Sequence, residues 1–314
     1  MQIRVSDAPY DARGDGTTDC TAALQAAIND AITRGTSVLI PSGVYILSDE
    51  LLIHGINQPD IRGEGIYGTR LQYTGTKKIK AVVHCTSDYA LMGGVIENLS
   101  ICGNANSQYG LAFDGNYGTI NSTVRRVGFA GMTDAGLMAS NANGCVWEQV
   151  MVLAAAGNYA LPLPEWGIIV DGGSGPDVII SPIIENTLKG GLWLKSGGFI
   201  TVTGAQISTM PIPLQCDAIA SSFHSCLFES GQSAVTGTGN KFNCCEISSA
   251  LPDKAVPTLK VSGQDNSFYG GCIADTLEIA SGANGNSFDR VANLAPSGVN
   301  DNSKWTRITR AWNG

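Results

Sequence analysis

The sequence predicts an elongated all-β fold built from a repeated coil, a β solenoid. Short β-type runs recur about every 22 residues through the middle and end of the chain, the spacing of stacked repeat units. Glycine is frequent, with 39 in 314 residues, and only 15% of residues are charged, as tight turns and stacked apolar faces require. The runs begin at Val124, Val146, Val178, Ile200, Phe223, Phe242, Phe268 and Phe288.

Charge and hydrophobicity exclude several classes of protein. The formal net charge is −8 without any run of Lys and Arg, so we expect no nucleic acid partner, because phosphate binding needs clustered cations. No apolar run approaches the roughly 20 residues that span a bilayer, so we expect no membrane insertion. The first residues do not resemble a signal peptide, and we expect either a removed leader or synthesis in the cytosol with another route out.

The nine cysteines do not follow a metal-binding spacing, and we expect neither a metal nor a cofactor. Cys226 and Cys245 each come three residues after a repeat Phe, and Cys272 comes four after. We therefore predict that they pack in the core as small apolar side chains.

The first 55 residues predict a helix that covers one end of the solenoid. Asp19 is the expected N-cap, an alanine-rich stretch follows, and Gly35 is placed to end the helix. Two strand signals come next, over 38–46 and 51–53, with a turn between them. An open solenoid end exposes unpaired strand edges, which such a helix would cover.

These opening residues resemble a known family. The stretch 11–19, the alanine-rich helix and the stretch 38–45 are similar to the start of the pectate-lyase-like superfamily. The resemblance implies a right-handed parallel β-helix with three strands per coil. We expect a cap helix and first strands in residues 1–55, β-helix coils over 56–295, and a C-terminal tail or cap over 296–314, where the repeat is lost.

One repeat interval is longer than the others by about ten residues. The extra residues lie near 154–166 and include two prolines, which predicts a loop that projects from the rod. Long loops often carry function, so Tyr159, Glu165 and Trp166 become candidates for it.

The motifs of polygalacturonases, alginate epimerases and pectate lyases are not found in this sequence. The remaining pattern resembles bacteriophage tailspikes and tail appendages. That resemblance implies a homotrimer that binds and cleaves bacterial surface polysaccharide, located in the virion tail; a secreted enzyme is the alternative.

The distribution of charged residues favours hydrolysis over elimination. No arginine lies between Arg126 and Arg290, although a lyase acting on uronic acids must stabilise substrate carboxylates and an enolate. Glycoside hydrolysis needs two carboxyl groups instead. Glu185 and Glu229 occupy similar points in coils separated by one further coil, which predicts roughly 9–10 Å between them, near the upper end of the range of inverting enzymes. The alternative is that both are turn or ladder carboxylates.

Other residues are candidates for binding a sugar. Glu165 beside Trp166 is the second catalytic hypothesis, with the indole as a flat apolar face; alternatively Trp166 anchors the loop. Trp193 and Tyr159 are further stacking candidates, although Trp193 equally fits a core position. His224 follows Phe223 on a strand, so it should face outward, as a substrate ligand or an ordinary surface residue.

Three functions remain open from the sequence. The first is a tailspike-like hydrolase of capsule or O-antigen, the second a non-catalytic glycan-binding or structural β-helix, and the third a secreted polysaccharide lyase or hydrolase. Turnover separates the first from the second, and activity as a calcium-dependent monomer would favour the third.

Overall fold

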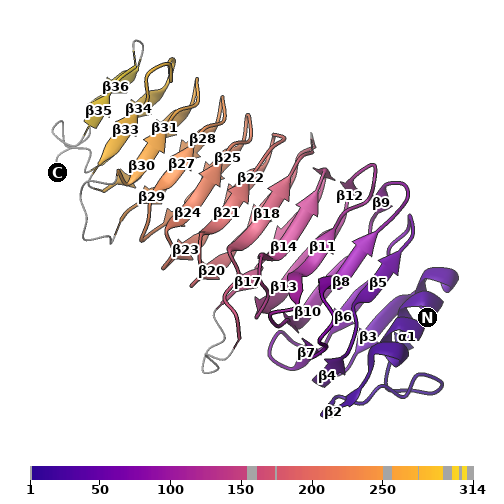
Figure 1. The fold of residues 1–314 in the computed structure, drawn as a ribbon. Helices are drawn as coiled ribbons and strands as arrows, with labels where there is room; N and C mark the ends of the chain where they lie inside the picture. Colours follow the sequence, from indigo (N-terminus) through magenta and orange to yellow (C-terminus); the bar gives the residue numbers. More distant parts are fainter. Residues whose placement is uncertain are drawn as a thin grey trace.

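The chain forms a rod in which strands from successive coils stack parallel to one another (Figure 1). The computed structural model describes residues 2–153, 161–173, 175–249, 257–274, 276–292, 299–303 and 306–309. Two long sheets run along the rod, with a third, short sheet beside them. The all-β solenoid predicted from the repeat is confirmed.

One of the long sheets, sheet B, contributes one strand from each coil along most of the rod. Its strands pair in the order of the coils, and each pairing is parallel. They are β5 (Leu51–His54), β8 (Ile79–Thr86), β11 (Ser107–Phe113), β14 (Ala135–Ser140), β18 (Trp166–Asp171), β21 (Gly190–Leu194), β24 (Ile212–Cys216), β27 (Ser233–Val235), β30 (Leu259–Val261), β33 (Leu277–Ile279) and β35 (Val299–Asp301).

The other long sheet, sheet A, bends to form two faces of the rod. Its first face holds β1 (Gln2–Arg4), β3 (Ser37–Ile40), β6 (Ile61–Gly63), β16 (Val146–Glu148), β19 (Val178–Ile180), β22 (Thr201–Thr203), β25 (Ser222–His224), β28 (Lys241–Asn243), β31 (Ser267–Tyr269), β34 (Ser287–Asp289) and β36 (Arg307–Thr309). Its second face holds β2 (Asp15–Asp19), β4 (Gly43–Leu47), β7 (Thr69–Tyr73), β17 (Met151–Val152), β20 (Ile183–Glu185), β23 (Gln206–Ser208), β26 (Leu227–Phe228), β29 (Glu246–Ile247) and β32 (Cys272–Ile273). Two long strands, β10 (Val95–Cys102) and β13 (Thr123–Ala130), span both faces.

The corner between the two faces of sheet A is a single residue with positive φ. In successive coils, with φ of 48° to 64°, it is occupied by Gln149, Ser181, Gly204, Ser225 and Cys244. This left-handed conformation costs a non-glycine residue roughly 1–2 kcal/mol, and it turns the chain sharply without a loop. On the opposite corner, the short sheet of β9 (Leu91–Met92), β12 (Thr119–Ile120) and β15 (Ala142–Asn143) joins sheet B to sheet A.

The core confirms the phenylalanine repeat and corrects the valine and isoleucine repeat. Four phenylalanines stack with ring centroids 4.4, 4.5 and 4.6 Å apart, in the order Phe223, Phe242, Phe268 and Phe288. Upstream, Val124 is aligned with Trp147, Ile179 and Val202 rather than with the predicted Val146, Val178 and Ile200. Consecutive apolar residues face both inward and outward there, so the sequence pattern does not fix the register.

The buried cysteines behave as core residues. Cys226 and Cys245 are buried, as predicted, whereas Cys272 is half-buried and Cys244 is exposed. All nine cysteines lie in the part of the chain that the structure describes.

Helix α1 (Thr21–Arg34) covers the N-terminal end of the rod (Figure 1). Its apolar side, formed by Leu24, Ala27, Ile28 and Ala31, is buried against the first coils. Gly35 ends the helix in the left-handed conformation, as predicted. The predicted N-cap is wrong by one residue: Cys20 holds that position, and Asp19 accepts the Thr21 N–H at 2.9 Å from just outside.

Two further expectations differ from the structure. The stretch 38–46 is two strands, β3 and β4, because the chain turns at Pro41–Ser42. The repeat also continues beyond Ala295, since β35 pairs with β33 and β36 pairs with β34. The expected loop is described only from Leu161 onward, and Tyr159 lies outside the described residues.

Candidate functional site

The outward face of sheet B carries an apolar strip with charged side chains along its borders. Cross-strand alignment places Ala135 next to Trp166, and Met138, Ile169 and Trp193 in one row on successive coils. Together with Ala81 and Ala112 these residues form an apolar cluster separate from the core. Because the alanine side chains are short, the larger side chains of this cluster extend beyond them.

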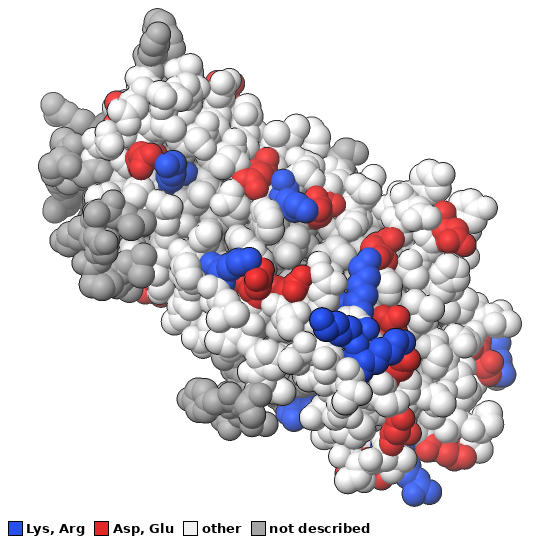
Figure 2. Space-filling model, viewed as in Figure 1, with Lys and Arg blue, Asp and Glu red and all other residues white. Residues whose placement is uncertain are grey.

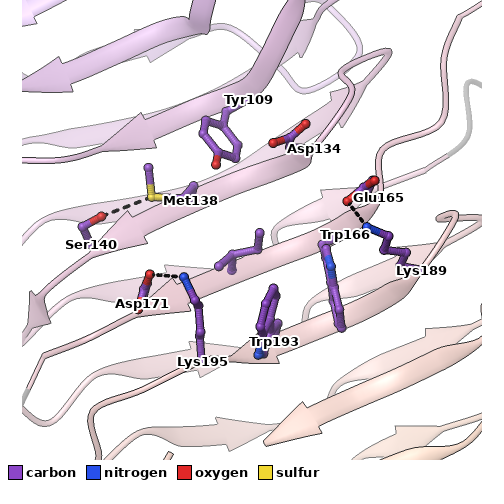
Figure 3. A pocket seen from close by; sticks show the side chains of 11 residues that line it. Tyr109, Asp134, Met138, Ser140, Glu165, Trp166, Asp171, Lys189, Trp193 and Lys195 are labelled. Carbon is purple, nitrogen blue, oxygen red and sulfur yellow. Dashed lines mark hydrogen bonds and ion pairs between the residues drawn. The ribbon is translucent and has the colours of Figure 1, made fainter. Parts of the chain in front are cut away.

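A cavity of about 280 Å³ lies on this strip, and we call it the groove (Figure 3). Its lining residues come from four neighbouring coils, on β11, β14, β18 and β21 and the residues beside them. They are Tyr109, Asp134, Met138, Ser140, Glu165, Trp166, Ile169, Asp171, Lys189, Trp193 and Lys195. The groove thus combines aromatic and aliphatic surface with a few charged groups, as ligand sites usually do.

Two tryptophans form the aromatic part of the groove. The ring centroids of Trp166 and Trp193 are 4.8 Å apart at an interplanar angle of 31°. Trp166 lies over Gly190, where an added Cβ would come within 2.2 Å of the Trp166 Cζ3 atom. The Trp193 Nε1–H donates to Asp217 Oδ2 at 2.9 Å, which fixes the orientation of that indole. Both rings are therefore held in place by their neighbours.

Three carboxylates border the groove. Glu165 is paired with Lys189 at 2.6 Å, and Asp171 with Lys195 at 2.6 Å. Asp134 accepts a hydrogen bond from Gln108 Nε2 at 2.7 Å. Figure 3 shows Asp134 and Glu165 at one side of the groove and the Asp171–Lys195 pair at the other.

Asp134 and Glu165 are neighbours on successive coils. The Trp166 N–H donates to the Asp134 carbonyl oxygen at 2.7 Å, and Ala135 is aligned with Trp166. Two carboxylates that follow one another across adjacent coils and face the same cavity are suited to act on one glycosidic bond. Tyr109 lines the same groove. Burial raises the pKa of its hydroxyl group, and the charges of Asp134 and Asp171 raise that pKa further.

A second charged cluster lies on the same face, toward the N-terminus. The His84 Nε2 atom is 2.8 Å from Asp114 Oδ1, its Nδ1 atom is 3.5 Å from Glu50 Oε2, and Lys80 pairs with Asp114. Burial alone would lower the pKa of His84, but the hydrogen bonds with Asp114 and Glu50 raise it to about 9. Burial works against ionised Asp114, yet His84 and Lys80 lower its pKa to about 2. His84 and Asp114 are therefore both charged near neutral pH.

The predicted pair Glu185 and Glu229 lies on sheet A instead. Glu185 is aligned with Ser208, and Glu229 directly follows Phe228, which is aligned with Ile207. The two glutamates therefore stand in one column two coils apart, as the sequence alignment of the coils predicted. They are not among the residues that line the groove, so a sugar lying on the two tryptophans would not contact both. Their catalytic role stays a prediction.

His224 also lies on sheet A. Phe223 is buried and His224 is half-buried, so the histidine faces outward as the alternation predicted. Its Nδ1 atom is 3.5 Å from Asn243 Nδ2. Of the residues predicted to bind or cleave a sugar, the structure brings together Glu165, Trp166 and Trp193.

The sequence also contains a signal for the two lysines of the groove, which were not among the predicted site residues. Lys189 follows Glu165, and Lys195 follows Asp171, by 24 residues in each case. That interval is one coil, so each pair was predictable as an ion pair between neighbouring strands. Asp134 gave no such signal, because its place beside Glu165 depends on the exact register across the long interval.

Among the described residues, no group of three or more His, Cys, Asp or Glu side chains is arranged to hold a metal ion. In the same part of the chain, no helix is long and apolar enough to cross a membrane.

Comparisons with known proteins support the resemblance seen in the opening residues. Residues 4–90 match the family described as rhamnogalacturonase A/epimerase, pectate lyase-like. This match confirms the resemblance to pectate-lyase-like proteins over the cap and first coils. A comparison with curated protein sequences found no match.

Solved structures resemble the whole rod. The ORF18 protein of Geobacillus virus E2 has a TM-score of 0.65 at 15% identity, over 98% of this chain and 61% of that one. The chain thus spans about three-fifths of the length of that viral protein. The Dettilon tailspike protein has a TM-score of 0.61 at 14% identity, over 98% of this chain and 68% of that one. The fold is a right-handed parallel β-helix.

Bacterial enzymes share the same fold. The A-module of the mannuronan C-5 epimerase from Azotobacter vinelandii has a TM-score of 0.54 at 15% identity, over 98% of this chain and 97% of that one. At such identities the likeness concerns the fold, so the function must be argued from the groove.

Proposed function

We propose that this chain binds a bacterial surface polysaccharide, capsule or O-antigen, along the groove of sheet B and hydrolyses it. The observation that carries the proposal is the meeting of Trp166, Trp193, Asp134 and Glu165 in one cavity. An extended chain of sugars fits a long rod, because each coil repeats the same surface along the axis. The aromatic rings would contact the C–H faces of the sugars, and the carboxylates would act on the bond between them.

In this proposal Asp134 and Glu165 share the catalytic work. The ammonium of Lys189 pairs with Glu165, which suits this residue to the ionised role of nucleophile or base. Asp134 is the second carboxyl group of the pair, and hydrogen bonds from Gln108 and Thr133 hold it in place. Adjacent coils are about 4.8 Å apart, close to the roughly 5–5.5 Å between carboxyl groups in retaining glycosidases. We therefore expect retention of the anomeric configuration.

The similar structures support the location of this activity. One is a protein of a virus and one is named a tailspike, so we propose that the chain belongs to a phage tail appendage. We also propose that it assembles as a homotrimer. A secreted lyase is the alternative location and reaction.

The test is a depolymerisation assay with capsule and O-antigen from a panel of strains. We expect new reducing ends, which mark hydrolysis. We expect no absorbance near 235 nm, because that absorbance would mark elimination. Glu165→Gln and Asp134→Asn should each lower turnover at least about 100-fold, within the usual contribution of acid–base catalysis. Glu185→Gln and Glu229→Gln serve as matched controls on sheet A and should retain activity. Loss of activity in these controls alone would move the site to sheet A.

A non-catalytic glycan-binding protein is the second candidate function. One observation favours it: each carboxylate of the groove already has a hydrogen-bond or ion-pair partner. Clear binding without turnover across a panel that contains the bound polymer would establish that function.

A further inference from the structure

The charges of the groove carry information about the class of polysaccharide that fits it. Three carboxylates line the cavity, from Asp134, Glu165 and Asp171, against two ammonium groups, from Lys189 and Lys195. Asp217, which accepts from Trp193, adds a further carboxylate at the edge. The groove therefore has an excess of negative charge.

Both ammonium groups are already paired with a carboxylate of the groove. Lys189 is bound to Glu165 at 2.6 Å, and Lys195 to both Asp171 at 2.6 Å and the face of Trp193, 5.6 Å from the ring centroid. No strand of sheet B within the described residues contains an arginine. Figure 2 shows basic side chains lying next to acidic ones over the middle of the rod, with uncharged surface between.

A polymer of uronic acids would bind less favourably to this arrangement of charges. Each carboxylate entering the groove would face Asp134, Glu165 or Asp171, or would have to displace one of them from its lysine. Like charges brought together in a partly buried site oppose binding, and such repulsion is a common source of specificity.

An uncharged sugar meets no such opposition. The half-buried ring of Trp193 offers contact to the C–H face of a pyranose ring, and the largely buried side chains of Trp166, Met138 and Ile169 form the apolar floor beside it. The paired carboxylates keep free lone pairs, which accept hydrogen bonds from sugar hydroxyls without displacing the lysines.

We infer that the groove selects a neutral polysaccharide, built of uncharged or N-acetylated hexoses, over polymers of uronic acids. This inference rests on the proposed function, because it assumes that a glycan lies on sheet B. The ion pairs Glu165–Lys189 and Asp171–Lys195 then act as specificity determinants as well as structural contacts.

The test compares matched polymers that differ only in charge. Surface polysaccharides from a panel of strains would be grouped as neutral or uronate-containing, and the latter would also be converted to their carboxyl-reduced, neutral forms. Affinity would be measured by gel retardation at low salt, to keep the electrostatic contribution visible. We expect carboxyl reduction to strengthen binding at least about tenfold, and neutral polymers to bind best.

A charge variant adds a second readout. Asp171→Asn releases Lys195 and should reduce the preference for neutral polymer about tenfold. Asp30→Asn is the control, since it releases Arg34 on helix α1 at the N-terminal end of the rod, which does not line the groove. Equal effects of the two variants would show that overall charge, rather than the groove, sets the preference, and would overturn the inference.

The outcomes also separate this inference from the proposed function. A uronate polymer could bind most tightly of all and lose this binding in Trp193→Ala. That result would support the groove as the glycan site and would overturn the inference that it selects neutral polymers. Binding that neither Trp166→Ala nor Trp193→Ala weakens would overturn the groove itself, and the inference with it.

Discussion

Gly190 controls the position of Trp166 in the groove. Its lack of a side chain lets the Trp166 ring lie across β21, because a Cβ there would approach the Trp166 Cε3 and Cζ3 atoms to 2.7 and 2.2 Å. The ring then reaches Trp193 on the next coil. The glycine is thus needed for a close approach rather than for a turn.

Gly190→Ala should displace Trp166 and weaken glycan binding about tenfold, in line with the loss of one stacking contact. The measurement is affinity for the bound polymer, with tryptophan fluorescence to follow the ring. Gly65→Ala is the matched control, since the nearest atom to a Cβ there would be 3.7 Å away. Unchanged affinity and fluorescence in the Gly190 variant would contradict this role.

Asp177 is a buried acid whose ionisation opposes folding. Burial raises the pKa of Asp177 to about 6, although the Cys145 N–H, which donates to its carboxylate at 2.8 Å, acts in the opposite direction. The unfolded chain releases this proton near pH 3.8. Since the folded state binds more protons between these values, stability falls as pH rises from about 4 to about 6.

Asp177→Asn should therefore raise the free energy of unfolding at pH 7 by about 1–3 kcal/mol and change it little at pH 4. The amide oxygen can still accept from Cys145. Urea unfolding at both pH values checks this prediction. A variant that is less stable at pH 7 would mean that the negative charge is stabilised by its surroundings.

Among the structural elements, β5, β8 and β11 are joined by the cluster of Glu50, His84, Asp114 and Lys80. The pKa of His84 is raised from 6.5 to about 9 in the folded state. Its contribution to stability is therefore complete below pH 6.5 and is lost as pH rises through 9. The size of the shift corresponds to about 3 kcal/mol.

The free energy of unfolding should accordingly fall between pH 6.5 and pH 9, and this fall should disappear in His84→Gln. The measurement is chemical denaturation at a series of pH values. His54→Gln is the control, because His54 is half-exposed and lies 3.8 Å from Asp88, so the fall should persist. An identical pH profile for the His84 variant and the unchanged protein would contradict the assignment.

The elements also show how far sequence reasoning extends. The phenylalanine strands were aligned correctly because each has one large apolar residue between polar ones, so only one face can be buried. The register of the valine and isoleucine strands was predicted wrongly because these strands have apolar residues on both faces. Strand β19, for example, is apolar at all three positions. A shift of one residue there moves every side chain between core and surface.

The groove was predictable only in part for the same reason. Glu165 and Trp166 adjoin in the sequence, but Trp193 is aligned with Ile169 rather than with Trp166. The two indoles meet because Trp166 leans across Gly190, which no repeat interval reveals. Asp134 joins them only through the register between β14 and β18.

For the whole molecule, the faces of the rod offer different surfaces. Sheet B carries both the groove and, nearer the N-terminus, the cluster around His84. Glu185, Glu229 and His224 lie on sheet A. A glycan can follow sheet B over several coils without contacting sheet A. We therefore predict one binding face, and sheet A remains available for contact between subunits in the proposed trimer.

The most direct test of this account is a crystal structure of the Glu165→Gln variant with an oligosaccharide from the polymer that binds best. The predicted result is a sugar chain on sheet B, with rings against Trp166 and Trp193 and a glycosidic oxygen beside Asp134. A sugar chain on sheet A beside Glu185 and Glu229, with the groove empty, would contradict the account.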